Sequence, residues 1–185
     1  PSPTASRRDP VSPDGCSTPR GFHLFPESNE PAPGSPCETV PVKILVLAIG
    51  KPKLSYAAEG VQEYCRRLRH YAPVTLEYLK VRDESAALLA RSEGSYRIAL
   101  DERGHQLDTV SFSERITQLE NRTELKKLTF LIGGADGHSP ELRERCDETW
   151  SLSRMTMQHE LALVVLLEQL YRVFTIKRGE PYHRA

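Results

Sequence analysis

The chain has 185 residues, enough for one compact domain with an apolar core or for one domain with an unstructured arm, and this leaves little room for a second full domain. Lysine and arginine together number 25, as do aspartate and glutamate, so the formal net charge is zero. This balance excludes a strongly basic protein, and an RNA partner would have to bind a local basic patch.

The cysteines indicate a reducing compartment. Cys16, Cys37, Cys65 and Cys146 stand singly, without the paired spacing of a zinc site or the density of a disulfide scaffold. No apolar stretch approaches the roughly 18 residues of a membrane-spanning helix, and the N-terminus lacks the apolar core of a signal peptide. We therefore expect a cytoplasmic protein with no membrane partner and no metal.

Residues 1–41 are rich in proline, mixed with serine, glycine and charged residues, and poor in aliphatic residues. Such a segment cannot bury enough apolar surface to offset the entropy of ordering it. We predict a disordered extension over 1–41 and one folded domain over 42–185.

From Val42 onward, short β-branched runs alternate with amphipathic stretches, which is typical of a parallel α/β sheet with helices on both faces. In chain order, the predicted strands cover 42–49, 74–81, 96–101, 127–132 and about 150–155. The predicted helices cover about 54–70 and 83–92, then begin at Ser111 and near Ser139, and the last covers about 159–178.

Local signals mark several helix ends. Ser111 and Glu114 form an S-x-x-E pattern, which predicts a capping box at the start of the third helix. Pro140 follows Ser139, where its missing N–H costs nothing, and Gly179 is placed to end the last helix. That helix is apolar on most sides from Leu161 onward, so it must be buried on more than one face, within the domain or against a second copy.

A glycine-rich loop, Gly133 to Gly137, follows the predicted strand 127–132 and precedes a helix. Ligand sites of open α/β sheets lie at the carboxyl ends of strands, and glycines let the backbone approach a ligand closely. The pattern alone is equally compatible with a tight strand-to-helix turn. It has neither the Lys-Ser/Thr ending of a phosphate-binding loop nor the spacing of a dinucleotide fingerprint, so it favours neither ATP nor NAD.

The C-terminal end gathers residue types that stack on bases, transfer protons and bind phosphates. They are His159 and Arg172 on the last predicted helix, and Tyr182, His183 and Arg184 in the tail. Singly, each is compatible with an ordinary surface role. Together they indicate a functional cluster.

Segments spread over the whole domain match a known family in order and spacing. They are KILVLAIGK (43–51), LIGGADG (131–137), WSLSRMT (150–156), HEL (159–161), LLEQLYRVF (166–174) and RGEPYHR (178–184). Over 42–185 the chain resembles the RlmH family of ribosomal RNA methyltransferases.

The resemblance implies a SPOUT-class fold, a parallel sheet whose C-terminal part forms a deep trefoil knot. It implies transfer of a methyl group from S-adenosylmethionine to N3 of a pseudouridine in 23S ribosomal RNA, on the assembled ribosome. It also implies a homodimer in which the partner's C-terminal tail completes the active site. The implied cofactor contacts are Leu100, Gly133, Gly134, Leu152, Ser153, Arg154, Met155, Thr156 and Met157.

The sequence departs from the family pattern at two positions. Gln158 stands where a proline is common, and we expect this to change only the rigidity of the cofactor loop. Leu163 stands where an arginine is common, and we expect it to remove a positive charge near the substrate side.

Methylation of N3 requires loss of its proton and benefits from positive charge beside the resulting anion. We expect Arg172 and Arg184 to orient the substrate and stabilise this charge, and His159 or Tyr182 to remove the proton, directly or through water. His183 is a further candidate.

Three alternatives remain at this point. A knotted methyltransferase for tRNA would keep the fold and change the substrate. A non-catalytic ribosome-associated RNA-binding protein is supported by Leu163 and predicts weak cofactor binding. A generic flavodoxin-like α/β protein predicts no role for the C-terminal Tyr-His-Arg.

Overall fold

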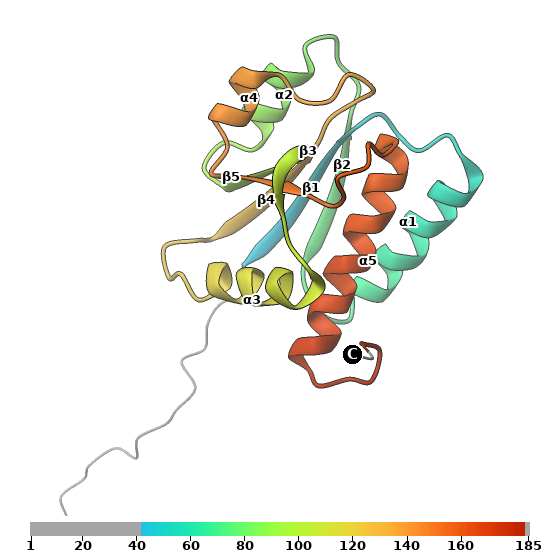
Figure 1. Cartoon of the computed structure of the whole chain (residues 1–185), viewed down its shortest axis with the longest axis vertical. Coiled ribbons are helices and arrows are strands. Elements are labelled where there is room, and N and C mark those ends of the chain that lie inside the picture. Colours follow the sequence, from blue (N-terminus) through green and yellow to red (C-terminus); the bar gives the residue numbers. More distant parts are fainter. Residues whose placement is uncertain (1–41, 184–185) are drawn as a thin grey trace, which may run out of the picture. The chain divides into compact units, whose positions relative to one another are not determined.

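The computed structural model describes residues 42–183, in which five strands and five helices alternate (Figure 1). The strands are β1 (Lys43–Ile49), β2 (Val74–Leu79), β3 (Tyr96–Gln106), β4 (Lys127–Ile132) and β5 (Glu148–Ser151). The helices are α1 (Ser55–Leu68), α2 (Glu84–Arg91), α3 (Thr109–Glu120), α4 (Pro140–Glu144) and α5 (His159–Lys177). The predictions for 1–41 and for Arg184 lie outside the described residues.

All neighbouring strands are parallel, and their order in the sheet is β2-β1-β4-β3-β5. The interior strand β1 is buried on both faces, as its unbroken apolar run predicts. Its side chains alternate between two core clusters, with Ile44, Val46 and Ala48 in the larger and Leu45, Leu47 and Ile49 in the smaller. The predicted parallel sheet with helices on both faces is confirmed.

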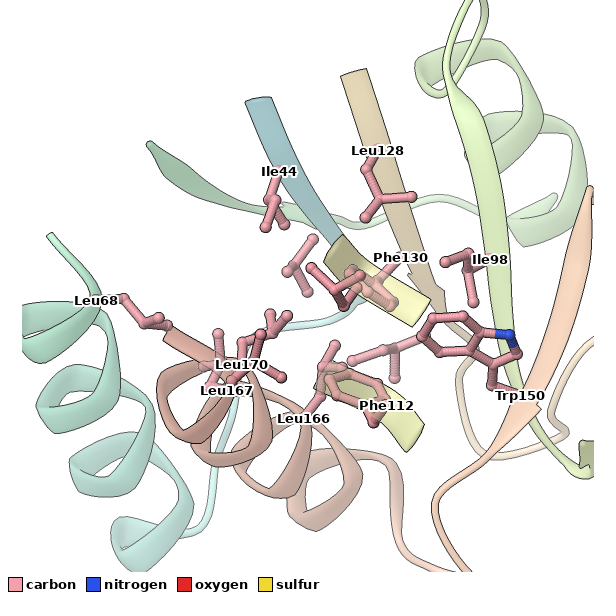
Figure 2. Close-up of a cluster of buried hydrophobic side chains, with 14 of the residues drawn as sticks. Ile44, Leu68, Ile98, Phe112, Leu128, Phe130, Trp150, Leu166, Leu167 and Leu170 are labelled. Carbon is pink, nitrogen blue, oxygen red and sulfur yellow. The ribbon is translucent and has the colours of Figure 1, made fainter. Parts of the chain in front are cut away.

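The larger core lies under α1, α3 and α5, and aromatic rings form its centre (Figure 2). The rings of Phe112, Phe130 and Trp150 meet pairwise with centroids 5.2 to 6.4 Å apart. Leu166, Leu167 and Leu170 of α5 are fully buried against this centre. Burial in the core of this domain therefore accounts for most of the apolar side chains of α5.

Leu163 also belongs to this core and is 2% exposed. The expectation that position 163 lies near the substrate side is wrong. Its side chain is packed against other apolar groups, and a leucine there removes no charge from any surface. The main support for a non-catalytic protein is thereby lost.

The capping box predicted for the third helix is also wrong. α3 begins at Thr109, and the carboxylate of Asp108 accepts a hydrogen bond of 2.7 Å from the amide of Ser111. Aspartate caps helices as well as serine does, and one placed three residues earlier satisfies the amide that Ser111 exposes. This bond lowers the pKa of Asp108.

The other predicted helix ends are confirmed. Ser139 accepts a hydrogen bond of 3.2 Å from the amide of Leu142 at the start of α4, and Pro140 is the first residue of that helix. Gly179 has a φ of 67° just beyond α5, where its amide donates to Ile176 and the amide of Glu180 donates to Thr175. This pair of bonds is a Schellman motif, which requires a left-handed residue.

The bounds of β3 and of its neighbour β5 differ from prediction. β3 continues to Gln106, and β5 covers Glu148–Ser151 instead of 150–155. Leu100 and His105 both pair with Trp150, so residues 101–104 arch out of the ladder and β3 resumes beyond them. Pairing with β5 therefore extends β3 through charged residues that local propensity does not favour in a strand.

Candidate functional site

The main cleft lies at the carboxyl edge of the sheet, where parallel α/β proteins bind ligands. It has a volume of about 280 Å³ and is lined by the arch of β3, the loop after β4, the loop after β5 and the start of α5. This volume is close to the lower end of small-molecule sites, roughly 300 to 1,000 Å³.

The loop after β4 is held close to itself by a tight turn. The amide of Gly137 donates to the carbonyl of Gly134 at 3.2 Å, and a Cβ on Gly133 would lie 2.9 Å from the backbone C and O of Gly137. The amide of Gly134 donates to the carboxylate of Glu84 at 3.2 Å. A glycine is thus required at position 133 because backbone occupies the space of a side chain.

His138 fastens the end of this loop. It is buried, and its Nε2 lies 3.1 Å from the carbonyl of Leu131. Burial lowers the pKa of His138, so the ring is neutral at pH 7. A neutral ring that donates to the carbonyl suits a structural role beside the cleft.

Charged residues of the β3 arch form one wall of the cleft, and sequence reasoning missed them. Asp101 pairs with Arg143 of α4 at 3.0 Å, and Glu102 accepts a hydrogen bond of 2.5 Å from the hydroxyl of Thr156. Arg103 also lines the cleft. The signal available in the sequence was a run of charges directly after a predicted strand, at the same edge as the glycine loop.

The loop after β5 also lines the cleft. The side chain of Ser153 accepts from the amide of Met155 at 3.0 Å, while the carbonyl of Ser153 accepts from the hydroxyl of Ser151 at 2.7 Å. Met155 is 78% exposed although it borders the cleft. An apolar side chain held in solvent at a cavity mouth is available to cover a ligand.

Helix α5 begins at the cleft with His159. The next residue, Glu160, is 5% exposed, and its Oε2 accepts hydrogen bonds of 3.0 Å from the amides of Lys53 and Leu54. These bonds lower the pKa of Glu160. The carboxylate therefore ties the start of α5 to the loop between β1 and α1.

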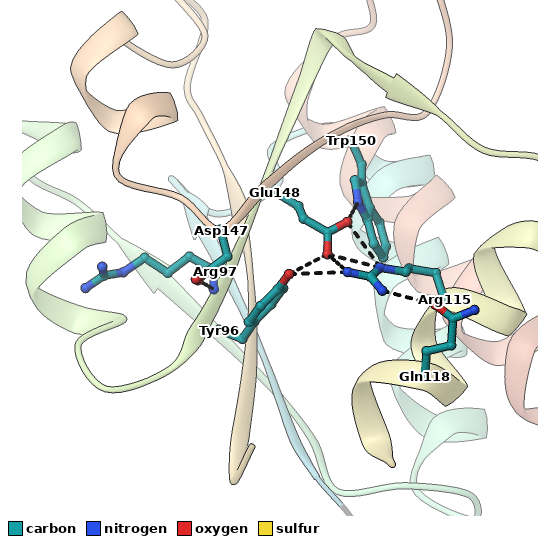
Figure 3. A network of polar contacts seen from close by, with 7 residues as sticks. All are labelled: Tyr96, Arg97, Arg115, Gln118, Asp147, Glu148 and Trp150. Carbon is teal, nitrogen blue, oxygen red and sulfur yellow. Dashed lines mark hydrogen bonds and ion pairs between the residues drawn. The ribbon is translucent and has the colours of Figure 1, made fainter. Parts of the chain in front are cut away.

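The start of β5 is anchored by a polar network (Figure 3). Glu148 accepts hydrogen bonds from the hydroxyl of Tyr96 at 2.5 Å, from Nη2 of Arg115 at 2.5 Å and from the indole of Trp150 at 2.8 Å. Burial alone would raise the pKa of Glu148, but these donors outweigh it and leave the pKa below its ordinary value. The network joins β3, α3 and β5 behind the loop that borders the cleft.

The predicted site residues fall into two groups. The predicted cofactor contacts line the cleft together with His159, except that the exposed Arg154 is not among the described residues lining it. Arg172 stands on the same helix as His159, and a rise of about 1.5 Å per residue places it roughly 20 Å further along. Tyr182 and His183 follow the far end of α5, and Arg184 lies outside the described residues.

The far group forms its own cluster. The guanidinium of Arg172 lies 4.8 Å from the ring centre of Tyr182, and the rings of Tyr171 and Tyr182 meet edge to face at 4.7 Å. Burial and a hydrogen bond with Tyr64 raise the pKa of Tyr182 to about 12. Among the described residues, the buried Nδ1 of His183 has no hydrogen-bond partner.

Two further features concern membranes and metals. Within 42–183, no helix is long and apolar enough to cross a membrane. Across the same range, histidine, cysteine, aspartate and glutamate side chains do not gather in groups of three or more suited to a metal ion.

A parallel α/β sheet with a glycine-lined cleft at its carboxyl edge defines a class of proteins that bind cofactor-sized ligands. Comparison with known families is more specific. The family model of the predicted SPOUT methyltransferases matches residues 42–183, and the chain belongs to this family. The methyltransferase resemblance read from the sequence is confirmed.

Individual relatives agree with the family match. The chain is 46% identical over 143 residues to ribosomal RNA large subunit methyltransferase H of Thermus thermophilus, covering 77% of this chain and 99% of that one. It is 40% identical over 150 residues to the protein of the same name from Desulfotalea psychrophila, covering 75% and 97%. The solved SpoU methyltransferase AviRb of Streptomyces viridochromogenes, in complex with AdoMet, has a TM-score of 0.41 and 16% identity over 71% of this chain and 58% of that chain, a likeness too low to carry an argument.

Proposed function

We propose that this protein transfers the methyl group of S-adenosylmethionine to N3 of a pseudouridine in 23S ribosomal RNA, on the assembled ribosome in the cytoplasm. The observation that carries the proposal is that the methyltransferase family match spans every segment of the cleft. Relatives named ribosomal RNA large subunit methyltransferase H, aligned over nearly their whole length, support the substrate class. The trefoil knot of the SPOUT class belongs to the same proposal.

The lining of the cleft supports S-adenosylmethionine as its ligand. Gly133 and Gly134 offer backbone without a Cβ, and Leu100, Leu152 and Met157 offer apolar walls. Asp101 of the β3 arch is paired with Arg143, so Glu102 is the carboxylate of the arch that lies at the cleft free of an ion pair within the described part of the chain and favours a positively charged sulfonium. When bound, the cofactor supplies a methyl group that is already activated for transfer, so the protein chiefly has to hold donor and acceptor in line.

The separation of the two residue groups supports a homodimer. Along α5, Arg172 lies roughly 20 Å from His159 at the cleft. Within one subunit, Arg172 and Tyr182 therefore do not line the cleft. We propose that the tail of a second copy supplies them. The exposed side chains of Val110 and Leu161 offer apolar surface for such a contact.

The described residues suggest a division of roles. At a pKa of about 12 the phenol of Tyr182 keeps its proton at pH 7, so it meets the substrate as a neutral ring whose oxygen can accept a hydrogen bond. His159 borders the cleft and is the residue that we propose removes the proton of N3, directly or through water. Arg172 and Arg184 orient the RNA and stabilise the anion, and His183 contacts it beside them.

The test uses cofactor labelled in the methyl group and two substrates, ribosomes from a strain whose 23S RNA lacks this methylation and unmodified tRNA. Label in 23S RNA, released as N3-methylpseudouridine on nucleoside analysis, is the expected result. Label in tRNA alone would favour a knotted tRNA methyltransferase. No label, with no calorimetric binding of S-adenosylmethionine, would indicate a non-catalytic RNA-binding protein.

A further inference from the structure

One carboxylate contacts two of the residues proposed for catalysis. Oε1 of Glu168 accepts hydrogen bonds from Nε of Arg172 at 3.0 Å and from Nη2 at 2.5 Å. The same oxygen accepts a longer bond of 3.4 Å from the hydroxyl of Tyr182. The guanidinium and the phenol thus share one carboxylate oxygen as acceptor.

The surroundings of Glu168 restrict the movement of the Arg172 side chain. Its side chain is 17% exposed and that of Arg172 26%, so the pair is only partly screened by water. The guanidinium also lies 4.8 Å from the ring centre of Tyr182, so Arg172 is bounded by the carboxylate and the ring. An arginine bonded through two of its nitrogens loses most of its freedom to rotate.

Glu168 itself is held from the other side. Nε2 of Gln169 donates to Oε2 of Glu168 at 2.6 Å, and the hydroxyl of Thr109 donates to Oε1 of Gln169 at 3.1 Å. Thr109 is the first residue of α3. A chain of side chains therefore runs from the packed body of the domain to the tail, and the carboxylate cannot turn without breaking it.

We infer that Glu168 is a positioning residue, which presents Arg172 and Tyr182 to the RNA substrate as one rigid pair. The inference rests on the proposed function, because it concerns residues assigned to the substrate. Glu168 lies outside the cleft proposed for S-adenosylmethionine, since the cleft lining ends at Ala162 on α5. Its loss should slow methyl transfer without weakening cofactor binding, because misplacing a group by about 1 Å can cost on the order of 100-fold in rate.

The experiment compares the full-length wild type with Glu168→Gln, which keeps the size and removes the charge, and Glu168→Asp, which keeps the charge. The matched control is Glu77→Gln, because Glu77 binds Arg91 through bonds of 2.6 and 2.7 Å between β2 and α2. The measurements are kcat on ribosomes, calorimetric affinity for S-adenosylmethionine, thermal unfolding, and the NMR hydrogen-exchange rate of the Nε–H of Arg172.

We expect Glu168→Gln to lower kcat at least tenfold, to leave the cofactor affinity within about twofold, and to speed exchange of the Arg172 Nε–H. Glu168→Asp should retain part of the wild-type kcat. Glu77→Gln should have the wild-type kcat. An unchanged kcat or an unchanged exchange rate in Glu168→Gln would overturn the inference. Equal losses of kcat, cofactor affinity and thermal stability would show a purely structural role and also overturn it. A wild type inactive on ribosomes would reject the proposed function instead, and the exchange rate would still decide whether Glu168 holds Arg172.

Discussion

At its amino end α5 borders a cleft shaped by backbone, whereas at its carboxyl end it carries a cluster shaped by side chains. The cleft depends on a turn between Gly134 and Gly137 and on a neighbouring glycine whose Cβ position is filled by backbone atoms. The far cluster depends on ion pairs and ring contacts among Glu168, Arg172 and Tyr182.

This difference corresponds to two kinds of ligand. A small cofactor of fixed shape is best held by a backbone cradle that does not move. An RNA nucleotide is best held by arginine and aromatic side chains, which bind phosphate and stack on bases. Helix α5 carries both regions, the cleft at its amino end and the side-chain cluster at its carboxyl end. Within residues 42–183 of one subunit these two regions do not meet.

The largest effect is expected from adding a methyl group to the glycine loop. Two single variants, Gly133→Ala and Gly134→Ala, test whether the backbone shapes the cleft. In Gly133→Ala the new Cβ would meet the backbone of Gly137 at 2.9 Å, whereas in Gly134→Ala it would meet Oε1 of Glu84 at 2.7 Å, the far end of a flexible side chain. Overpacking against backbone costs about 1 to 3 kcal/mol, so we expect Gly133→Ala to weaken S-adenosylmethionine binding roughly 10- to 100-fold.

Gly134→Ala is the comparison variant: Glu84 is a flexible side chain that can rotate away from the new methyl group, so the loss of affinity should be smaller than in Gly133→Ala. Calorimetric titration of both variants, with thermal unfolding to confirm the fold, gives the comparison. Equal affinities in the two variants would show that the tight turn does not shape the cofactor site.

A second test asks whether the two regions act across subunits. Gly133→Ala damages the cleft and Arg172→Ala damages the tail, so each variant alone should be strongly impaired when the cofactor is kept well below its Kd for Gly133→Ala. After unfolding and refolding them together, about half of the dimers should be mixed, each with one intact site, which restores about one quarter of wild-type activity. Methyl transfer is measured against each variant refolded alone, and a mixture no more active than its parts would mean that cleft and tail belong to one subunit.

The sequence predicted the first of these regions far better than the second. The glycine loop and the segment after β5 are local patterns at strand ends, and the parallel sheet brings such ends to one edge whatever the details of packing. Their approach could therefore be expected from the sequence alone. The arch of β3 could not, because it depends on Leu100 and His105 sharing one partner on β5.

The errors in the sequence analysis have the same origin. Leu163 was placed by analogy with a pattern, and only packing reveals that its side chain is in the core. Glu168 and Arg172 stand four residues apart on α5, so their ion pair could have been expected from helix spacing, whereas the contact of Glu168 with Tyr182 becomes visible only when the tail folds back. Periodic patterns along the sequence do not reveal contacts between residues that are far apart in the chain.

A smaller effect is expected where the cleft end of α5 is tied down. Glu160 has a pKa below its ordinary 4.5 because it accepts bonds from the amides of Leu54 and Lys53. A depressed pKa in the folded state stabilises the protein above pH 4.5, and the contribution is lost as the pH falls through the folded value. Glu160→Gln should therefore unfold at a lower urea concentration than the wild type at pH 7, and the two midpoints should converge as the pH falls below 4.5 and through the folded pKa of Glu160.

The control for acid sensitivity is Glu141→Gln, an exposed position at the start of α4 whose pKa is also lowered, by its own amide and by Ser139. It should change the midpoint little, because an exposed helix-terminal carboxylate is readily replaced by water. A constant gap between Glu160→Gln and the wild type from pH 7 to pH 3 would show that the charge of Glu160 is not what holds the loop.

The smallest effect is expected at Gln158, which precedes α5. Its φ of −61° already lies in the range that a proline ring imposes, and its side chain makes only an exposed contact of 3.4 Å with the hydroxyl of Tyr56. Gln158→Pro should stabilise the fold by about 0.4 to 1 kcal/mol, because it restricts the unfolded chain without straining the folded one. Urea unfolding measures the gain, and cofactor affinity should stay within about twofold of the wild type. A loss of stability would show that the loop leading into α5 needs the amide hydrogen of residue 158. It would also show that a φ suited to proline is not sufficient for this position to accept one.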